Sequence, residues 1–143
     1  MFREILDKIT KIIEKKVIKI MEMKYGEKEI REFDINKENF KNEIAKARTF
    51  GFDYELEYLK KNNLALGGSL ENAIVVTANG VMNPYGLRYE DEFVRHKVLD
   101  LLGDIYLLNR PIIGKIIAKQ TGHVENIALV KALKSMEIAN DQA

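Results

Sequence analysis

The chain has 143 residues, 46% of them hydrophobic and 31% charged, and its 23 basic and 22 acidic side chains leave a formal net charge of +1. These totals predict one soluble globular domain with a real core and argue against nucleic-acid binding, which usually needs a basic excess. The absence of cysteine excludes a disulfide scaffold and a cysteine-based zinc finger, and no apolar run approaches the roughly 18 residues of a membrane span, so we expect a cytoplasmic protein.

The first 35 residues predict a helix followed by two strands. Apolar residues recur at helical spacing over residues 2–16, opposite a set of lysines, which indicates an amphipathic helix. The pattern is β-like over residues 17–25, turns at Gly26, and continues as a second strand over residues 30–35. We interpret the helix as a surface helix with a solvated lysine face. A membrane-surface or partner-binding helix is the alternative.

Residues 36–61 predict two helices with a break between them. Asn36 is suited to cap the first helix, because its short side chain can accept hydrogen bonds from the first free backbone amides. This helix is expected to turn Phe40, Ile44 and Ala47 inward. Residues 48–52 interrupt it, and a short helix follows over residues 53–61.

Residues 67–80 combine a glycine break with a buried strand. The run Gly67-Gly68-Ser69 stops regular structure. The apolar run over residues 73–77 predicts a buried strand, and Asn79-Gly80 predicts a turn after it.

The strongest helical pattern covers residues 90–108. Its apolar residues recur every three or four positions, and they are Phe93, Val94, Val98, Leu101, Leu102, Ile105 and Leu108. An isoleucine-rich strand is expected over residues 111–118, and a last helix from His123 to about residue 139. The predicted fold class is therefore α+β, a two-layer sandwich with helices packed on one face of a β-sheet.

Two residues of the long helix have the spacing of a metal site. His96 and Asp100 are four residues apart and therefore share one face of the helix. An imidazole and a carboxylate placed in this way can reach the same ion, and both are normal zinc ligands. An H-x-x-x-D pair is also common as a surface ion pair, and the spacing alone leaves that alternative open.

Other polar residues lie close to this pair. Asp104 continues the same face one turn later within an apolar helix, where a buried carboxylate needs a partner such as a cation. Lys97 adds a positive charge, although an exposed surface lysine is its ordinary interpretation. His123, the second of only two histidines, follows Gly122, and a first-turn helix residue without chemistry is its alternative.

A third metal ligand is missing. A catalytic zinc usually has three protein ligands and one open position. The sequence has no third histidine and no H-E-x-x-H motif. Either the site is incomplete or another polypeptide segment completes it.

Three segments carry a family resemblance. Residues 43–52 end in the run ARTFGF, residues 67–76 read GGSLENAIVV, and residues 87–100 read LRYEDEFVRHKVLD. These runs resemble segments of the UDP-3-O-acyl-N-acetylglucosamine deacetylases, the zinc hydrolases of lipid A biosynthesis. Gly103-Asp104 and Gly122-His123 follow in that family's order. The resemblance covers about residues 36–135 and is highly specific, whereas residues 1–35 match only loosely.

The resemblance implies a fold and a domain division. The family has two α+β domains with the active site between them, and this chain resembles the second domain. We therefore expect one domain over residues 1–143. Residues 1–35 would supply an N-terminal helix and the first strands, and residues 36–143 would form the C-terminal domain of a zinc deacetylase.

The resemblance also implies roles for single residues. His96 and Asp100 become two of three Zn²⁺ ligands. His123 becomes the charged histidine that stabilises the transition state and protonates the leaving amine, and Asp104 becomes the carboxylate that orients it. The remaining expected contacts are with substrate: Thr49 at the developing oxyanion, Lys97 at the polar head, Phe50 and Phe52 near the sugar and acyl passage, and Gly68 and Ser69 in a segment that lines the acyl tunnel.

The implied activity is removal of acetate from a UDP-linked, 3-O-acylated N-acetylglucosamine. In the family the third zinc histidine and a neighbouring glutamate base come from the first domain, and neither occurs in this sequence. We therefore expect the chain to supply only the C-terminal half of the active site. The alternatives are a truncated or degenerate non-catalytic remnant, and an interaction module that pairs with a separate chain carrying the first domain.

Overall fold

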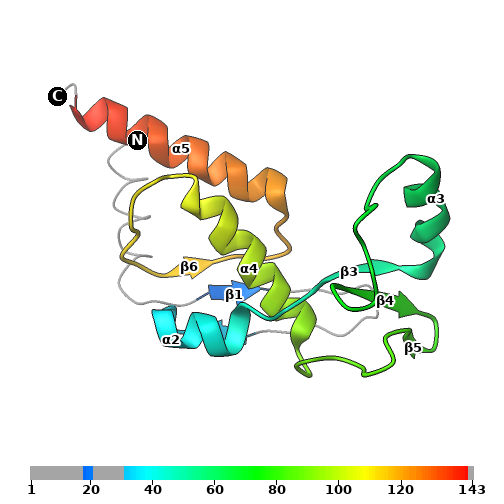
Figure 1. Cartoon of the computed structure of the whole chain (residues 1–143). Coiled ribbons are helices and arrows are strands. Elements are labelled where there is room, and N and C mark those ends of the chain that lie inside the picture. The colour runs from blue at the N-terminus through cyan, green and yellow to red at the C-terminus, as the bar shows by residue number, and fades with distance from the viewer. Residues whose placement is uncertain (1–17, 21–30, 142–143) are drawn as a thin grey trace.

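The computed structural model describes residues 18–20 and 31–141, and the side chains of residues 31–136. The predicted helix over residues 2–16 and the turn at Gly26 lie outside the described residues. The described part is α+β, as predicted, with helices beside two small mixed sheets (Figure 1). No helix within it is both long enough and apolar enough to cross a membrane.

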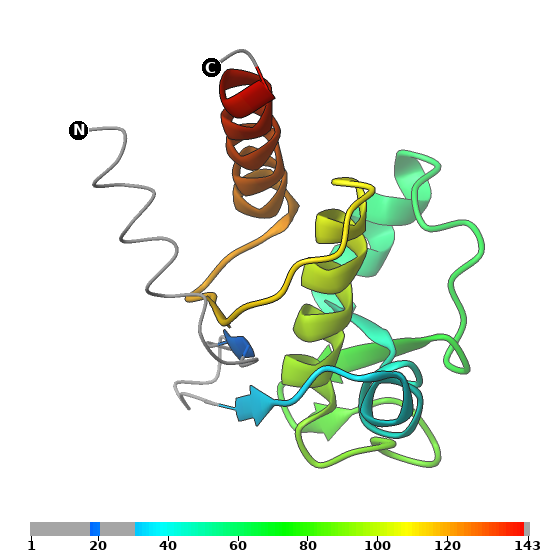
Figure 2. The same ribbon diagram turned by 90° about the vertical axis from the view of Figure 1, so that its left-hand side faces the viewer.

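The first sheet joins distant parts of the sequence. Strand β1 (Ile18–Ile20) pairs antiparallel with β2 (Arg31–Phe33) and parallel with β6 (Ile116–Ile117). Helix α4 (Glu92–Tyr106) contacts β1, and helix α5 (His123–Asp141) packs against α4 (Figures 1 and 2). In this half of the molecule α4 therefore lies on the sheet, and α5 packs on α4.

The second sheet carries a small lobe, the crossover over residues 53–72 that contains α3. Strand β3 (Thr49–Phe52) runs parallel to β4 (Ala73–Thr77), and β4 turns into the short strand β5 (Gly80–Val81). The crossover between β3 and β4 contains the 3₁₀ turn η2 (Asp53–Glu55) and helix α3 (Leu56–Lys61). The strand predicted over residues 73–77 and the turn at Asn79-Gly80 are confirmed. The predicted break over residues 48–52 is largely strand β3.

The cap predicted at Asn36 is confirmed. Its Oδ1 accepts hydrogen bonds from the backbone amides of Glu38 (3.0 Å) and Asn39 (2.9 Å). Helix α2 (Lys37–Asn39) then continues into a π-helical turn, η1 (Phe40–Ile44). Ile44 is fully buried, as expected for the inward face of this segment.

Helix α4 organises the core. Val94, Val98, Leu101 and Ile105 recur at helical spacing and are all buried in one cluster. The helix is unbroken, and it begins two residues after and ends two residues before the predicted span of 90–108. The periodic pattern thus fixed both the element and its buried face.

The isoleucine-rich strand predicted over residues 111–118 is mostly wrong. Only Ile116–Ile117 is strand, and the Ile113 residue is 85% exposed. Among the described residues, β6 pairs with β1 at two register positions. A strand extends only where a neighbouring strand supplies backbone hydrogen bonds. The expected single sheet is likewise divided into two.

A buried ion pair ties the second sheet to α4. The Glu92 side chain has no solvent exposure. Its carboxylate accepts hydrogen bonds from Arg48 N (2.9 Å), Arg48 Nε (2.9 Å), Arg48 Nη2 (3.1 Å) and Arg88 N (2.6 Å). Arg48 Nη2 also donates to Gly86 O (2.9 Å). The start of β3, the loop before α4 and the first turn of α4 are therefore held at one point.

The two carboxylates at the start of α4 have lowered pKa values. Burial acts to raise the pKa of Glu92, but the bonds from Arg48 and Arg88 outweigh it and leave the pKa below its ordinary 4.5. Burial also acts to raise the pKa of Asp91, and its bonds from Arg95 and Arg31 bring it below 3.8. Both groups stabilise the fold as anions.

The lowered pKa values predict acid sensitivity. A carboxyl whose pKa is depressed by folding contributes stability above its unfolded pKa, and the contribution is lost as the pH falls through the folded pKa. We expect the free energy of unfolding to fall as the pH drops below the ordinary carboxyl pKa values of 3.8 and 4.5. Urea unfolding at a series of pH values measures this.

Two variants isolate the cause. Asp91→Asn should be less stable than wild type at pH 7, and the gap should narrow as the pH falls because wild type loses the same anion. Glu90→Gln changes an exposed neighbouring carboxylate and should follow the wild-type curve. An equal gap between wild type and Asp91→Asn at pH 7 and at pH 3 would contradict the assignment.

Candidate metal centre and ligand pocket

His96 and Asp100 meet on one face of α4. The distance between His96 Nε2 and Asp100 Oδ1 is 3.2 Å, and the two side chains are 14% and 22% exposed. His96 Nδ1 lies 3.2 Å from Ala47 O. A carbonyl oxygen only accepts, so Nδ1 carries the hydrogen and Nε2 of the neutral ring presents a lone pair to the carboxylate.

The donor atoms of His96 and Asp100 are suited to bind a cation. Two acceptor atoms 3.2 Å apart need a proton or a positive ion between them, and an imidazole nitrogen with a carboxylate oxygen is a normal zinc donor pair. Among the described residues, no group of three histidine, cysteine, aspartate or glutamate side chains is placed to hold a metal ion. The described chain thus offers two donors of the three that a catalytic zinc usually takes.

The pair also perturbs its own protonation. Burial acts to lower the pKa of His96, but hydrogen bonds to Asp100 and to the Ala47 carbonyl raise it above its ordinary 6.5. Burial acts to raise the pKa of Asp100, and the hydrogen bond from His96 and the positive charges of His96, His123 and Lys97 bring it below 3.8. Without a metal, a proton shared between the two groups is the favoured occupant.

A second histidine–carboxylate pair lies one turn along the helix. His123 Nδ1 is 2.7 Å from Asp104 Oδ2, and its side chain is 69% exposed. Asn126 Nδ2 donates to the same oxygen at 2.9 Å and is buried. The carboxylate therefore holds the Nδ1 edge of the imidazole, and the rest of the ring is exposed to solvent. His123 is also the first residue of α5, in the first helical turn where the alternative without chemistry places it.

Phe50 connects the helix to a cavity. Its ring packs edge-on against Phe93 (centroids 5.0 Å apart) and lies 6.4 Å from the His96 ring. Lys97 Nζ is 5.8 Å from its centroid. Thr49 precedes it on β3 and is exposed. The predicted site residues His96 and Lys97 therefore both lie beside the Phe50 ring.

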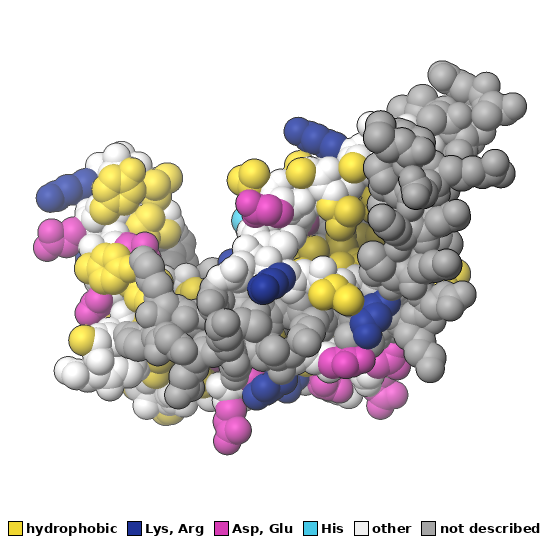
Figure 3. Space-filling view, turned by 180° about the vertical axis from the view of Figure 1, so that it is seen from behind, with side chains coloured by type: hydrophobic (Ala, Val, Ile, Leu, Met, Phe, Trp, Pro, Cys, Tyr) yellow, Lys and Arg dark blue, Asp and Glu magenta, His cyan; other side chains and the backbone are white. Residues whose placement is uncertain are grey.

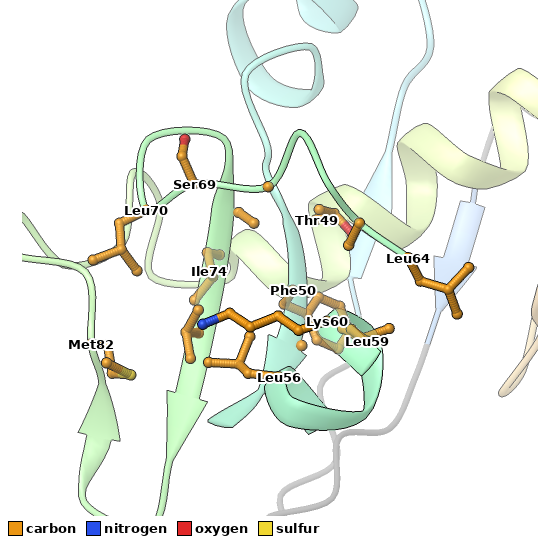
Figure 4. A pocket seen from close by; sticks show the side chains of 15 residues that line it. Thr49, Phe50, Leu56, Leu59, Lys60, Leu64, Ser69, Leu70, Ile74 and Met82 are labelled. Carbon is orange, nitrogen blue, oxygen red and sulfur yellow. The ribbon is translucent and has the colours of Figure 1, made fainter. Parts of the chain in front are cut away.

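The cavity has a volume of about 420 Å³. It opens between the sheet of β3 and β4 and the lobe of α3, and Figure 4 shows Leu56, Leu59 and Lys60 of α3 on one side and Ile74 of β4 on the other. Four predicted site residues line it, namely Thr49, Phe50, Gly68 and Ser69. Its size and apolar walls suit a hydrocarbon ligand.

The segment over residues 67–76 combines an exposed loop with a buried strand. Leu70 is 39% exposed and Ala73 is half-buried, whereas Ile74 and Val75 are buried, so the loop offers apolar surface and the strand is anchored. Figure 3 shows hydrophobic side chains gathered on the lobe of α3, with a hollow between this lobe and α4.

Phe52 does not line the cavity, unlike Phe50 on the same strand. Its ring stacks on Tyr54 at 5.3 Å. Residues on a strand point alternately to opposite faces, so Phe50 and Phe52 share a face only where the strand stays regular. The 3₁₀ turn that begins at Asp53 ends β3 at Phe52.

Three polar residues escaped the sequence analysis. Asn83 is buried, accepts from Val75 N (3.0 Å) and donates to Leu70 O and Ala73 O (both 2.7 Å), so it holds the loop of the cavity to β4. Asn126 was detectable by its position three residues after His123 on one helix face. Glu92 gave no signal, because in sequence it is one of three adjacent acidic residues.

Comparison with known proteins agrees with the motifs. A family profile described as UDP-3-O-acyl N-acetylglycosamine deacetylase matches residues 12–135. The chain is 53% identical over 106 residues to the UDP-3-O-acyl-N-acetylglucosamine deacetylase of Shewanella sp. (strain W3-18-1). It is 52% identical over 106 residues to that of Shewanella woodyi (strain ATCC 51908 / MS32). Each alignment covers 74% of this chain and 35% of the relative, so the chain spans about a third of the length of these curated relatives.

The His96–Asp100 contact predicts a measurable pKa. In the metal-free protein the pKa of His96 should lie above 6.5, and Asp100→Asn should lower it, because burial of the ring then acts without the opposing carboxylate. A pH titration of the ring resonances by NMR measures both. The Glu90→Gln variant should leave the pKa of His96 unchanged. An unchanged pKa in Asp100→Asn would show that the contact with Asp100 does not raise it.

Proposed function

The chain belongs to the UDP-3-O-acyl N-acetylglycosamine deacetylase family, and from this we propose that it carries the C-terminal half of a zinc-dependent deacetylase site. The substrate would be UDP-3-O-acyl-N-acetylglucosamine, the compound in the names of its relatives, in lipid A biosynthesis. The lack of cysteine fits the cytoplasmic location that we propose with it.

The observation that carries the proposal is the 3.2 Å approach of His96 Nε2 and Asp100 Oδ1 beside an apolar cavity. His96 is held in the tautomer that a metal requires, since its Nδ1 donates to Ala47 O. Zn²⁺ bound by this pair would supply Lewis-acid polarisation of the amide carbonyl and a water that is nucleophilic near neutral pH.

His123 supports the departure of the amine. Its Nδ1 faces Asp104 Oδ2 at 2.7 Å, so its Nε2 is the atom that holds a proton toward the exposed side of the ring. An imidazolium oriented by a carboxylate stabilises negative charge as it develops and then donates its proton to the leaving nitrogen. Asn126 keeps that carboxylate in place.

The remaining residues would bind and orient the substrate. The Thr49 hydroxyl would donate to the developing oxyanion, and the Lys97 ammonium would attract the negatively charged head. The 3-O-acyl chain would enter the cavity that Phe50, Gly68 and Ser69 line. Phe52, which stacks on Tyr54 at the end of β3, would border the site from outside this cavity.

The third zinc ligand and the general base would come from a polypeptide segment outside this sequence. A base that removes the proton from the attacking water contributes on the order of 10²–10⁴ in rate. A partner segment that brings a histidine and a glutamate would complete both functions.

The first test is zinc binding and deacetylation. The chain alone should bind Zn²⁺ through two protein donors, and His96→Ala should weaken that binding at least about tenfold, or 1.4 kcal/mol. Deacetylase activity should be low for the chain alone and should rise when a polypeptide carrying the missing histidine and glutamate is added. Calorimetry and an assay of released acetate measure the two quantities.

The outcome separates the alternatives. His123→Ala should abolish the recovered activity and leave Zn²⁺ affinity close to wild type, because it is not a ligand. Full activity of the lone chain would refute the incomplete site. Failure to bind Zn²⁺ in any mixture would favour a non-catalytic remnant or an interaction module.

A second test addresses the acyl cavity. Leu64 lines the cavity and Leu66 does not, and both are exposed enough to be replaced without disturbing the core. Leu64→Asp should weaken binding of a fluorescent fatty acid about tenfold, because it places a charge against the hydrocarbon. Leu66→Asp, the matched control, should bind like wild type. Equal affinity in both variants would place the acyl chain elsewhere.

A further inference from the structure

One peptide group joins a buried carboxylate to the candidate metal ligand. The amide of the Ala47–Arg48 peptide donates to Glu92 Oε1 at 2.9 Å, and the carbonyl of the same peptide accepts from His96 Nδ1 at 3.2 Å. We propose that Glu92 is a positioning residue for His96 and acts through this peptide. The inference rests on the proposed role of His96 as a metal ligand and adds Glu92 to that site.

The peptide group can pass polarisation from its N–H to its carbonyl because the two are joined by resonance. Its partial double bond moves electron density from nitrogen to oxygen. An anion at the N–H end favours that polarisation, and hydrogen bonds in such a chain strengthen one another. The Glu92 carboxylate therefore makes Ala47 O a better acceptor for His96 Nδ1–H. A firmly held Nδ1–H directs the Nε2 lone pair toward Asp100.

The groups that link Glu92 to His96 through the peptide are buried and have little freedom to move. Ala47 and Arg48 are 5% and 8% exposed, and Glu92 is 0% exposed. Glu92 and His96 are four residues apart on α4, so one helical turn presents a carboxylate to one end of the peptide and an imidazole to the other. Strand β3 begins at Thr49, directly after this peptide, and the same contact fixes where Thr49 stands relative to His96.

A purely structural role is the competing explanation, because Glu92 also pairs with the Arg48 side chain. Asp91 provides the matched control. It is adjacent, buried and at the start of the same helix, and its carboxylate accepts hydrogen bonds from Arg31 and Arg95 instead of from the Ala47–Arg48 peptide. Loss of either anion disturbs the helix start, but only Glu92 is linked to the imidazole.

The experiment compares Glu92→Gln with Asp91→Asn in the full chain. The first readout is the His96 Nδ1–H proton resonance by NMR, recorded in the metal-free protein at a pH where the ring is protonated. The second is Zn²⁺ affinity by calorimetry, and thermal unfolding checks that both variants are folded. Glu92→Gln should shift the Nδ1–H resonance upfield, as its hydrogen bond weakens, and should lower Zn²⁺ affinity about 10–100-fold. Asp91→Asn should leave the resonance unshifted and change Zn²⁺ affinity less than about threefold. This limit is smaller than the effect of removing a residue that positions a metal ligand.

The remaining outcomes are also decisive. If Glu92→Gln does not fold because Arg48 is left unpaired, the double variant Arg48→Met with Glu92→Gln removes both charges, keeps the backbone amide, and should show the same upfield shift. An unmoved resonance, or equal losses of affinity in the Glu92 and Asp91 variants, overturns the proposal. If wild type fails to bind Zn²⁺ both alone and in the completed mixture, the proposed function fails, and the Nδ1–H resonance still decides whether Glu92 acts on His96 through the peptide.

Discussion

The buried pair of Arg48 and Glu92 is the constraint on which the rest of the arrangement depends. A carboxylate with no solvent exposure is costly unless its acceptor sites are filled, and here Arg48 and Arg88 supply four hydrogen bonds. Removing one partner of such a pair typically costs about 3–5 kcal/mol, since the other charge is left buried and unpaired. The contact joins segments more than 40 positions apart, so it holds the sheet of β3 and β4 against α4 in one orientation.

That orientation brings the candidate chemistry together. Helix α4 carries His96, Asp100 and Asp104 at successive turns, and α5 adds His123 beside the last of them. Strand β3 enters next to His96 because Arg48 is fixed, and Phe50 then separates the imidazole from the cavity under α3. A polar site at a helix and an apolar cavity behind a strand suit a substrate with a charged head and a hydrocarbon chain, as the proposed function requires.

Local patterns were enough for the elements that depend on local physics. The apolar period of α4, the cap at Asn36 and the strand over residues 73–77 were predicted because each is set by neighbours in sequence. The isoleucine run over residues 111–118 shows the limit. Its composition favours a strand, but strand length is set by pairing, and among the described residues β6 pairs with β1 at two register positions.

The sequence by itself determined the α+β class, the helix that carries His96 and Asp100, and the motifs by which the family is identified. Helical spacing is a local property, so both side chains had to share a face. Only the tertiary structure decided which groups meet across distance: the Ala47 carbonyl at His96, Glu92 at the next amide, Asn126 at Asp104, and the walls of the cavity. Those contacts depend on how β3, α4 and α5 pack, and no spacing along the chain encodes the distance between atoms on different elements.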